Sequence, residues 1–447
     1  MLDLFTYDPI VLCLLAGLVA ISAGFIAALS VKRYELAIFL VVLSPWISAL
    51  FVPNAPENLT GSNPTIGSYI RFALLILMGN VGIITVFRQK LKQNQFMPFQ
   101  FVLLGTFLAL TLMSTGYSID QRHTFIRSAF FILFFCFLLG LSSWLRNEYQ
   151  LQKTINAIFW ALFFCLVMNI IAMPLFPNRV WWFMAENRFQ GLWSQPNEMG
   201  AFCMVFYPVL AWKYEASTAS KKRLIVLCAI ATLILHFLTG SRTTLISAAL
   251  GMITWFLITK RPGKLVIFST GLMVATVVFF LLRPPGFMRE GYEKVAEFTG
   301  RTEIWTAAVT LAIEKPILGY GYEVGGKIFE DQRFYNREIS QWSGNPKSSL
   351  HNGYLSVFIG LGIVGFLLFY FTLFIPFIRR QGLLKTEYKA FWVTILVMSI
   401  VTNLTESFIS GPTNIGSSVL WIAWVMVGKM LISDGKTFQQ DAVILKS

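Results

Sequence analysis

The stretch LHNGYLSVFIGLGIVGFLLFYFTLFIPF, residues 350–377, contains no Asp, Glu, Lys or Arg and has a histidine next to its first residue. An apolar run of about 20 residues is long enough to cross a bilayer as an α-helix. Similar runs recur along the chain, in which hydrophobic residues make up 56% of the sequence. This composition predicts an all-α membrane protein with many spans and excludes an ordinary soluble domain.

We expect 13 spans, and a count of about 12–14 allows for boundary errors of a few residues. They lie near residues 9–29, 34–52, 68–87, 98–114, 124–145, 153–173, 198–213, 224–240, 244–259, 265–283, 350–377, 391–406 and 416–433. Residues 1–283 then form N-terminal helices with short loops, and 284–349 form one long loop carrying short helices. Residues 350–447 form the C-terminal helices and a short tail.

The net charge of +14 could suggest nucleic acid, but the positions of the cations favour a membrane orientation signal. Alternate short loops carry 21 of the Lys and Arg residues, for example Lys32-Arg33 and Lys221-Lys222-Arg223. Cytoplasmic loops are the ones enriched in Lys and Arg. This pattern puts the C-terminus in the cytoplasm, the N-terminus outside, and the 284–349 loop on the outer face.

The outer loop is unusually basic, with nine Lys and Arg residues over 283–349, which indicates a role beyond topology. Within it, apolar residues from Thr302 to Glu314 follow the helical spacing, and Pro316 ends the pattern. We therefore expect an amphipathic helix on the membrane surface or on the bundle, with Arg301 at its N-terminus. A helix N-terminus favours anions and Arg adds a bidentate donor, so a phosphate could bind there. The alternative is an Arg that bridges the helix and lipid headgroups.

Three further outer segments contain candidate residues. Arg242 lies in a very short turn, where it could reach a lipid phosphate or hold a ligand phosphate in a cavity. Arg188 precedes the span 198–213, and Asn197 is expected to cap that helix. The glycine-rich segment 319–326 lacks the strand and lysine of a phosphate-binding loop, so we expect a flexible turn there.

The chain has only three histidines, and two of them lie at outer span ends. Imidazole titrates near neutral pH and can take a proton from a hydroxyl. We rank His351 first as a general base, because it follows the polar, Arg-rich loop, and His123 second. His236 lies within an apolar span and is expected to pack there. The outer loops lack a D-x-D or E-x-D motif, so no metal site is predicted.

Four segments together resemble a known family. They are Gly240–Thr243 (GSRT), Gly300–Trp305 (GRTEIW), Pro316–Gly321 (PILGYG) and His351–Tyr354 (HNGY), the last followed by Gly362 and Gly365. A His-Asn pair, a nine-residue gap and Gly-x-x-Gly resemble the signature of the O-antigen ligase/polymerase family. The resemblance is strongest over about residues 185–370.

This resemblance implies a C-type glycosyltransferase fold in the bacterial inner membrane, with the active site facing the periplasm. It implies a glycan donor on undecaprenyl pyrophosphate, membrane lipids and a glycan or lipid A–core acceptor as partners, and no metal or other cofactor. His351 is implied as the base, Arg301 and Arg242 as pyrophosphate-binding residues, and Arg188 as a looser match. Asn352, Gly362 and Gly365 would support the motif, the glycines through close packing or room for the undecaprenyl chain.

The particular reaction stays open between members of this family. The His-Asn motif favours an O-antigen ligase acting on lipid A–core in lipopolysaccharide synthesis. An O-antigen or exopolysaccharide polymerase shares the motif. From another class, a lipid-linked sugar transporter would need polar residues along a path through the membrane, and few are present: Arg71, Asn403 and Glu406 lie near span ends.

Overall fold

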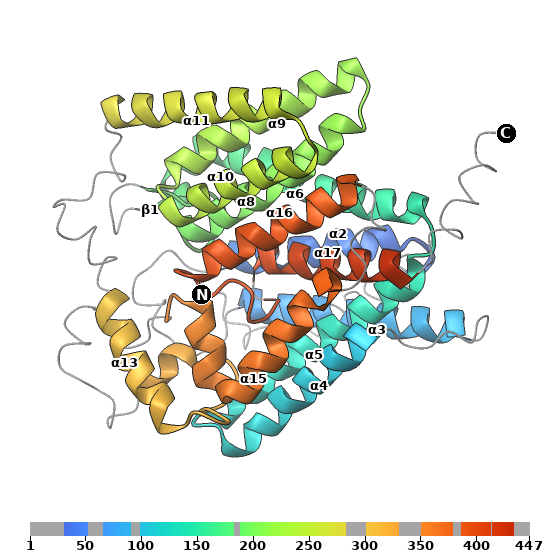
Figure 1. The fold of residues 1–447 in the computed structure, drawn as a ribbon, viewed down its shortest axis with the longest axis vertical. Helices are drawn as coiled ribbons and strands as arrows, with labels where there is room; N and C mark the ends of the chain where they lie inside the picture. Colours follow the sequence, from blue (N-terminus) through green and yellow to red (C-terminus); the bar gives the residue numbers. More distant parts are fainter. Residues whose placement is uncertain are drawn as a thin grey trace, which may run out of the picture.

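A computed structural model describes residues 31–51, 66–90, 99–182, 188–282, 301–329, 350–378, 386–412 and 414–432. The expected first span, 9–29, lies outside these residues, as do parts of the 284–349 loop. The described chain is a bundle of α-helices with one two-stranded ribbon (Figure 1).

The first half of the bundle contains α2 (Tyr34–Leu50), α3 (Ile66–Lys90), α4 (Phe99–Met113), the 3₁₀ turn η3 (Ser114–Tyr117), α5 (Gln121–Trp144), α6 (Glu148–Leu175) and α7 (Pro177–Val180). The antiparallel strands β1 (Trp181–Trp182) and β2 (Arg188–Phe189) follow, with Trp181 opposite Phe189. The second half contains α8 (Pro196–Glu215), α9 (Ala219–Leu238), α10 (Arg242–Ile258), α11 (Pro262–Leu282), α13 (Arg301–Glu314), η5 (Gly325–Phe329), α15 (Gly353–Ile378), α16 (Thr386–Asn403) and α17 (Ile415–Ile432).

The expected all-α membrane architecture is confirmed. Each predicted span from 34–52 onward corresponds to a helix among the described residues. Five of these helices are long and apolar enough to cross a membrane, over residues 66–89, 99–117, 121–144, 148–175 and 353–376. Shorter apolar helices include Tyr34–Leu50, Arg242–Ile258 and Ile415–Met430.

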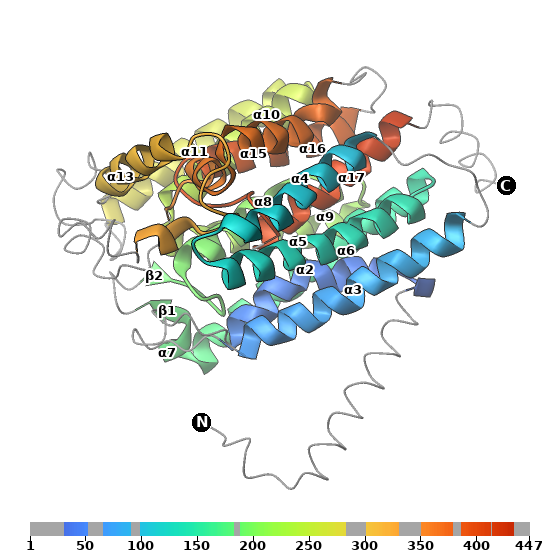
Figure 2. The same ribbon diagram turned by 90° about the horizontal axis from the view of Figure 1, so that it is seen from below.

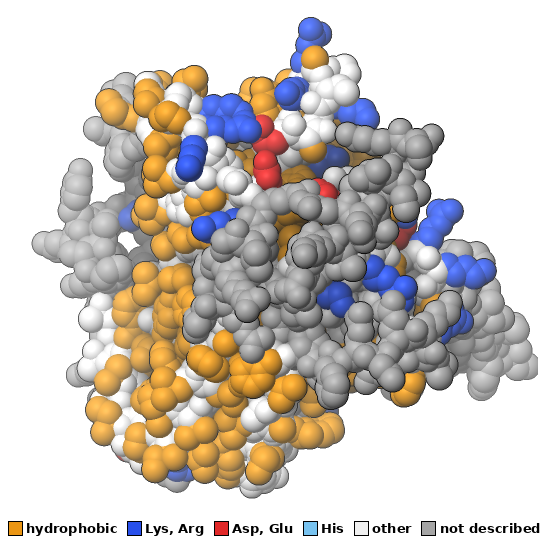
Figure 3. All heavy atoms as spheres, turned by 45° about the vertical axis from the view of Figure 1, so that its right-hand side comes forward, with side chains coloured by type: hydrophobic (Ala, Val, Ile, Leu, Met, Phe, Trp, Pro, Cys, Tyr) orange, Lys and Arg blue, Asp and Glu red, His pale blue; other side chains and the backbone are white. Residues whose placement is uncertain are grey.

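The two ends of the bundle differ in charge. At the end we call the basic end, Lys153 pairs with Glu35 at 3.2 Å, and Arg261 and Lys264 pair with Glu215. Figure 3, turned to bring this end forward, shows Lys and Arg side chains gathered around it and hydrophobic side chains covering a flank. The opposite end, which we call the site end, carries the starts of α8 and α10 and the end of α16.

Helix α17 lies at the centre of the bundle and contacts α2, α5, α8, α15 and α16 (Figure 2). Its Trp421 and Trp424 are fully buried. Beside it, α3 and α5 approach so closely that a Cβ on Gly140 would lie 2.3 Å from the Gly82 Cα. Small residues allow such contact between helix backbones, which gains van der Waals packing where the hydrophobic effect between helices is weak. Helices α3 and α5 are thus in close backbone contact.

Helix α13 confirms the amphipathic helix expected in the long loop. Its apolar face is buried, with Ile304, Ala308, Leu311 and Ala312 each at most 7% exposed. This face joins a small core with Tyr320, Val324 and Ile359 of α15. The helix therefore packs on the bundle and brings Arg301, at its first position, to the site end.

Helix α15, which matches the predicted span 350–377, has a break at Gly362 that the sequence analysis did not include. Gly362 has φ 61° and ψ −165°, and Figure 1 shows the two halves of α15 running in different directions. The freed backbone groups bond to the segment after α13, because the Ile363 amide donates to the Pro316 carbonyl at 2.8 Å. A Cβ on Gly362 would lie 2.1 Å from the Ile317 oxygen.

The glycine-rich segment after α13 forms turns, and its backbone also bonds to α15. The Tyr320 amide donates to the Ile359 carbonyl at 2.9 Å, and the Gly321 amide donates to the Gly360 carbonyl at 2.8 Å. The segment therefore adds a short stretch of backbone pairing to the break in α15. Gly365 faces Leu361 across this break, where an added Cβ would meet the Leu361 Cβ at 2.2 Å.

Candidate active site

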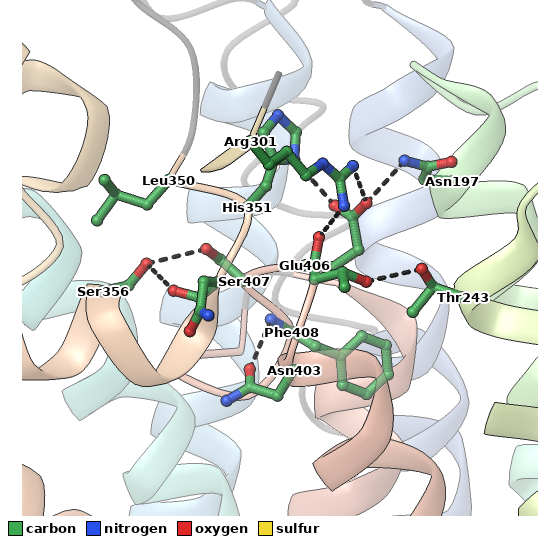
Figure 4. A network of polar contacts seen from close by, with 12 residues as sticks. Asn197, Thr243, Arg301, Leu350, His351, Ser356, Asn403, Glu406, Ser407 and Phe408 are labelled. Atoms are coloured by element: carbon green, nitrogen blue, oxygen red, sulfur yellow. Dashed lines mark hydrogen bonds and ion pairs between the residues drawn. The ribbon is translucent and has the colours of Figure 1, made fainter. Parts of the chain in front are cut away.

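A buried carboxylate, Glu406, is the centre of the polar network at the site end (Figure 4). Its Oε2 lies 3.1 Å from His351 Nδ1. Its Oε1 accepts hydrogen bonds from the Arg301 guanidinium and from the Asn197 amide, both at 2.8 Å. The Glu406 side chain is only 16% exposed. One carboxylate thus joins residues from α8, α13 and the start of α15.

The chain after α16 places this carboxylate. Helix α16 ends at Asn403, three residues before Glu406, so Glu406 lies in a turn rather than within the predicted span 391–406. The Asn403 Oδ1 accepts hydrogen bonds from the backbone amides of Phe408 and Ile409, which fixes the turn. Thr405 adds a hydroxyl contact of 2.7 Å to Thr243 at the start of α10.

His351 is held at the start of α15 by contacts on both of its neighbours. The Leu350 carbonyl accepts the Trp305 indole N–H from α13 at 3.0 Å. Asn352 caps α15, because its Oδ1 accepts the Leu355 amide at 3.0 Å, and its Nδ2 donates to the Leu404 carbonyl at 3.1 Å. His351 itself has φ 46°, a left-handed backbone conformation that non-glycine residues adopt rarely and often at functional sites.

The charges at Glu406 decide the tautomer of His351. Burial raises the pKa of the Glu406 carboxyl, but the hydrogen bond with His351 and the charge of Arg301 outweigh burial and leave the pKa below its ordinary value of 4.5. Glu406 is therefore ionised near neutral pH and can only accept hydrogen bonds. His351 must then donate through Nδ1–H, and in the neutral imidazole the lone pair is on Nε2. Figure 4 shows that second ring nitrogen on the side away from Glu406.

Arg301 lies where the sequence predicted, at the N-terminus of α13. Besides its ion pair with Glu406, its guanidinium donates to the Thr405 carbonyl. The side chain is 19% exposed, so it is largely removed from water but still reachable. The structure thus brings Arg301 and His351 to the same carboxylate, although 50 residues separate them in sequence.

The other two predicted arginines reach the site less directly. The Arg188 Nε donates to the Thr239 carbonyl at 2.7 Å, and its NH2 group donates to the Asn197 Oδ1 at 2.8 Å. Asn197 links Arg188 to Glu406 and does not cap α8, which begins at Pro196 after Gln195; the expected cap is wrong. Arg242 is the first residue of α10 and is half-buried, next to Thr243.

The two other histidines lie in different surroundings. His123 follows Asp120, whose carboxylate caps α5 by accepting the His123 amide at 2.8 Å and also pairs with Lys327. His236 is 1% exposed and bonds to Tyr207 and Thr244 through its two ring nitrogens, at 3.2 and 2.9 Å. Its expected role in packing agrees with this position.

Sequence reasoning missed Glu406 and Asn197 as site residues. Glu406 was noted only as a polar residue near a span end. The available signal was the cost of a carboxylate at the edge of an apolar span, which is high unless a cation or hydrogen-bond donor pairs with it. Nothing in the sequence indicated which cation that would be.

These features define a class: a polytopic helical membrane protein with a His–Glu–Arg network at one end of its bundle. Residues 227–370 match the family model described as O-antigen ligase. This stretch is thus similar to an O-antigen ligase domain, which supports the predicted membership of the O-antigen ligase/polymerase family. The matched region includes Arg242, Arg301, His351, Gly362 and Gly365, whereas Arg188, Asn197 and Glu406 lie outside it. A comparison with curated proteins gave no match.

Proposed function

We propose that this protein transfers a glycan from undecaprenyl pyrophosphate to a sugar hydroxyl at the periplasmic face of the bacterial inner membrane. The contact of His351 and Arg301 with one buried carboxylate is the observation that carries this proposal. It combines a proton acceptor with a cation suited to phosphate, on a domain whose family has glycosyltransferase activity.

In the proposed reaction, the acceptor hydroxyl attacks the anomeric carbon of the donor sugar. Its proton passes to the His351 Nε2, and Glu406, which accepts from Nδ1, orients the ring and stabilises the imidazolium that forms. The bond from the anomeric carbon to the pyrophosphate oxygen breaks, and the electron pair leaves with the pyrophosphate. A single displacement of this kind inverts the anomeric configuration.

Arg301 and Arg242 would stabilise the charge that grows on the leaving pyrophosphate. Guanidinium groups bind phosphate oxygens through paired N–H donors, and a largely dry site strengthens that interaction. These residues would supply the positive charge that a metal ion supplies in other transferases, so we propose a metal-independent enzyme. Arg188 would act mainly by fixing Asn197, and through it Glu406.

Replacement of the base tests this function. We expect His351→Ala to insert and fold but to lose transfer from a lipid-pyrophosphate glycan in a purified system. The matched control is His123→Ala, which changes a histidine at the same end of the bundle that lies outside the network. Transfer by His351→Ala at the wild-type rate would show that His351 is not the base.

The same variant in cells tests which reaction is carried out. We favour an O-antigen ligase acting on lipid A–core, in which case lipopolysaccharide loses its O-chain while lipid-linked polymer accumulates. Loss of the polymer itself would instead identify an O-antigen or exopolysaccharide polymerase. Movement of the lipid-linked glycan across liposomes without transfer would favour the transporter alternative.

A further inference from the structure

His236 has a hydrogen-bond partner at each of its ring nitrogens, although it lies in an apolar helix. It is close to the end of α9 and only 1% exposed. Its Nε2 lies 2.9 Å from the Thr244 hydroxyl on α10, and its Nδ1 lies 3.2 Å from the Tyr207 hydroxyl on α8. A histidine inside a membrane span is costly, and where it occurs it usually serves a function. The polar contacts of His236 to two other helices therefore point to a role beyond packing.

The Thr244 hydroxyl decides the direction of these hydrogen bonds. It donates its one proton to the Ser241 carbonyl at 3.1 Å, so it accepts from the His236 Nε2–H. In the neutral ring Nδ1 is then an acceptor, which suits the Tyr207 O–H. A directed chain of hydrogen bonds thus runs from Tyr207 through His236 and Thr244 to the Ser241 carbonyl.

The backbone of His236 is tied to the same turn between α9 and α10. The Thr239 hydroxyl donates to the His236 carbonyl at 2.7 Å and accepts the Ser241 amide at 3.1 Å. Helix α8 packs closely on this turn, since an added Cβ on Gly200 would lie 2.5 Å from the Thr244 Oγ1. The side chain and the backbone of His236 therefore both restrict where α10 begins.

The first turn of α10 carries two residues that reach the candidate site. Arg242 is the first residue of this helix, and the hydroxyl of the next residue, Thr243, lies 2.7 Å from the Thr405 hydroxyl. Thr405 directly precedes Glu406, and its carbonyl accepts from the Arg301 guanidinium. A shift at the start of α10 would therefore move Arg242 and disturb the turn that carries Glu406.

We propose that His236 is a positioning residue that sets the first turn of α10. Through this turn it places Arg242 and the contact between Thr243 and Thr405. It acts through these neighbours and not on a reacting group. Its consequence for donor binding, through Arg242, rests on the proposed function, whereas its effect on the turn itself does not.

Hydrogen exchange of the full-length protein in nanodiscs tests the effect on the turn. His236→Leu fills most of the space of the ring but removes both hydrogen bonds of its nitrogens. We expect amide exchange about threefold faster or more at Leu245 and Glu406, whose amides donate to the Ser241 and Thr402 carbonyls in the wild-type protein. His236→Gln keeps an N–H donor near the place of Nε2 and should restore most of the protection.

Thr232→Val is the matched control for this measurement. Thr232 is buried one turn earlier on α9, and its hydroxyl donates to the Cys228 carbonyl of the same helix at 2.7 Å. This variant should leave exchange at Leu245 and Glu406 unchanged.

Two results would overturn the positioning role. One is wild-type exchange in His236→Leu, and the other is exchange in His236→Gln as fast as in His236→Leu, which would assign the effect to the shape of the ring. If His236→Leu does not fold, Thr244→Val removes the hydroxyl at nearly constant volume and should show the same faster exchange. Wild-type exchange in that variant would equally contradict the proposal.

Binding of undecaprenyl pyrophosphate, which carries no glycan to transfer, tests the effect on Arg242. We expect His236→Leu to weaken binding about threefold to tenfold. In the Arg242→Gln background the same substitution should change binding by less than about twofold, because the guanidinium that His236 places is already absent. Equal weakening in both backgrounds would show that His236 does not act through Arg242.

The positioning role and the proposed function can fail separately. Unchanged binding by Arg242→Gln alone would remove Arg242 from the proposed donor site, but the exchange measurement contains no substrate and would still decide the role of His236. Wild-type exchange in His236→Leu, together with weaker binding by Arg242→Gln, would remove the positioning role and leave the proposed function in place.

Discussion

Replacement of Glu406 by Gln tests the network most directly, because Gln keeps the shape of the side chain but removes its charge. The amide oxygen can still accept from Arg301 and Asn197 in place of Oε1. The amide nitrogen then faces the His351 Nδ1, 3.1 Å away in the wild-type protein. Two donors cannot pair, so the imidazole must carry its proton on Nε2 and present a lone pair at Nδ1. The nitrogen that would accept the substrate proton is then blocked.

The size of the effect follows from these contacts. Loss of general base catalysis costs about 10²–10⁴-fold in turnover, and we expect Glu406→Gln to fall in this range. Breaking a buried ion pair by removing one partner destabilises a protein by about 3–5 kcal/mol. The Arg301–Glu406 pair is 19% and 16% exposed, so it is nearer the buried limit than a surface pair. A measurable fall in the midpoint of thermal unfolding should accompany the loss of activity.

The assay is transfer of labelled glycan from lipid pyrophosphate by the purified protein in nanodiscs, with unfolding followed in parallel. Glu314→Gln serves as the control, since Glu314 accepts the Tyr320 hydroxyl at 2.9 Å on α13 but lies outside the network. The control should keep transfer within about twofold of the wild-type rate. Turnover of Glu406→Gln within tenfold of the wild-type rate would refute the assignment of Glu406 as the residue that orients His351.

The remaining predictions concern the same end of the bundle. The pKa of the Glu406 carboxyl in the folded protein is below its ordinary value of 4.5. Its ionised form therefore stabilises the protein above pH 4.5, and this contribution is lost as the pH falls through the pKa of the folded state. Over that acidic range the unfolding midpoint of Glu406→Gln should depend less on pH than that of the wild-type protein. Arg301→Lys keeps the charge but not the fork, and should reduce transfer about tenfold or more; full activity would argue against bidentate phosphate binding. Gly362→Ala would put a Cβ 2.1 Å from the Ile317 oxygen and should destabilise the protein by more than about 1 kcal/mol. The control is Gly263→Ala on α11, where an added Cβ meets open space and should not destabilise the protein. Unfolding midpoints of the two variants measure the difference. Asn197→Ala removes one hydrogen bond to the carboxylate and should cost about 1–3 kcal/mol of stability with only a moderate loss of turnover; unaltered stability would exclude it from the network.

Most of the helices could be predicted from the sequence, because a lipid environment leaves few alternatives. Backbone groups in a bilayer must be satisfied within the segment, so each long apolar run becomes a helix. The spans predicted from 34–52 onward and the amphipathic helix after Arg301 follow from this rule and from apolar spacing. The break at Gly362 within the predicted span 350–377 could not be predicted in this way. It is stabilised by the Pro316–Ile317 backbone, from far away in sequence, which accepts the freed amides.

For the candidate site too, part could be predicted from the sequence and part could not. The chemically unusual residues could be identified from the sequence alone: a rare histidine beside an Arg-rich loop, an arginine at a helix N-terminus, and the family segments in which they lie. That His351 and Arg301 share Glu406 could be seen only in the folded protein. That contact needs α16 to end at Asn403 and α13 to pack on α15. It depends on how helices far apart in sequence pack together. The apolar periodicity of a segment shows which face of that helix is buried, but not which other helix covers it.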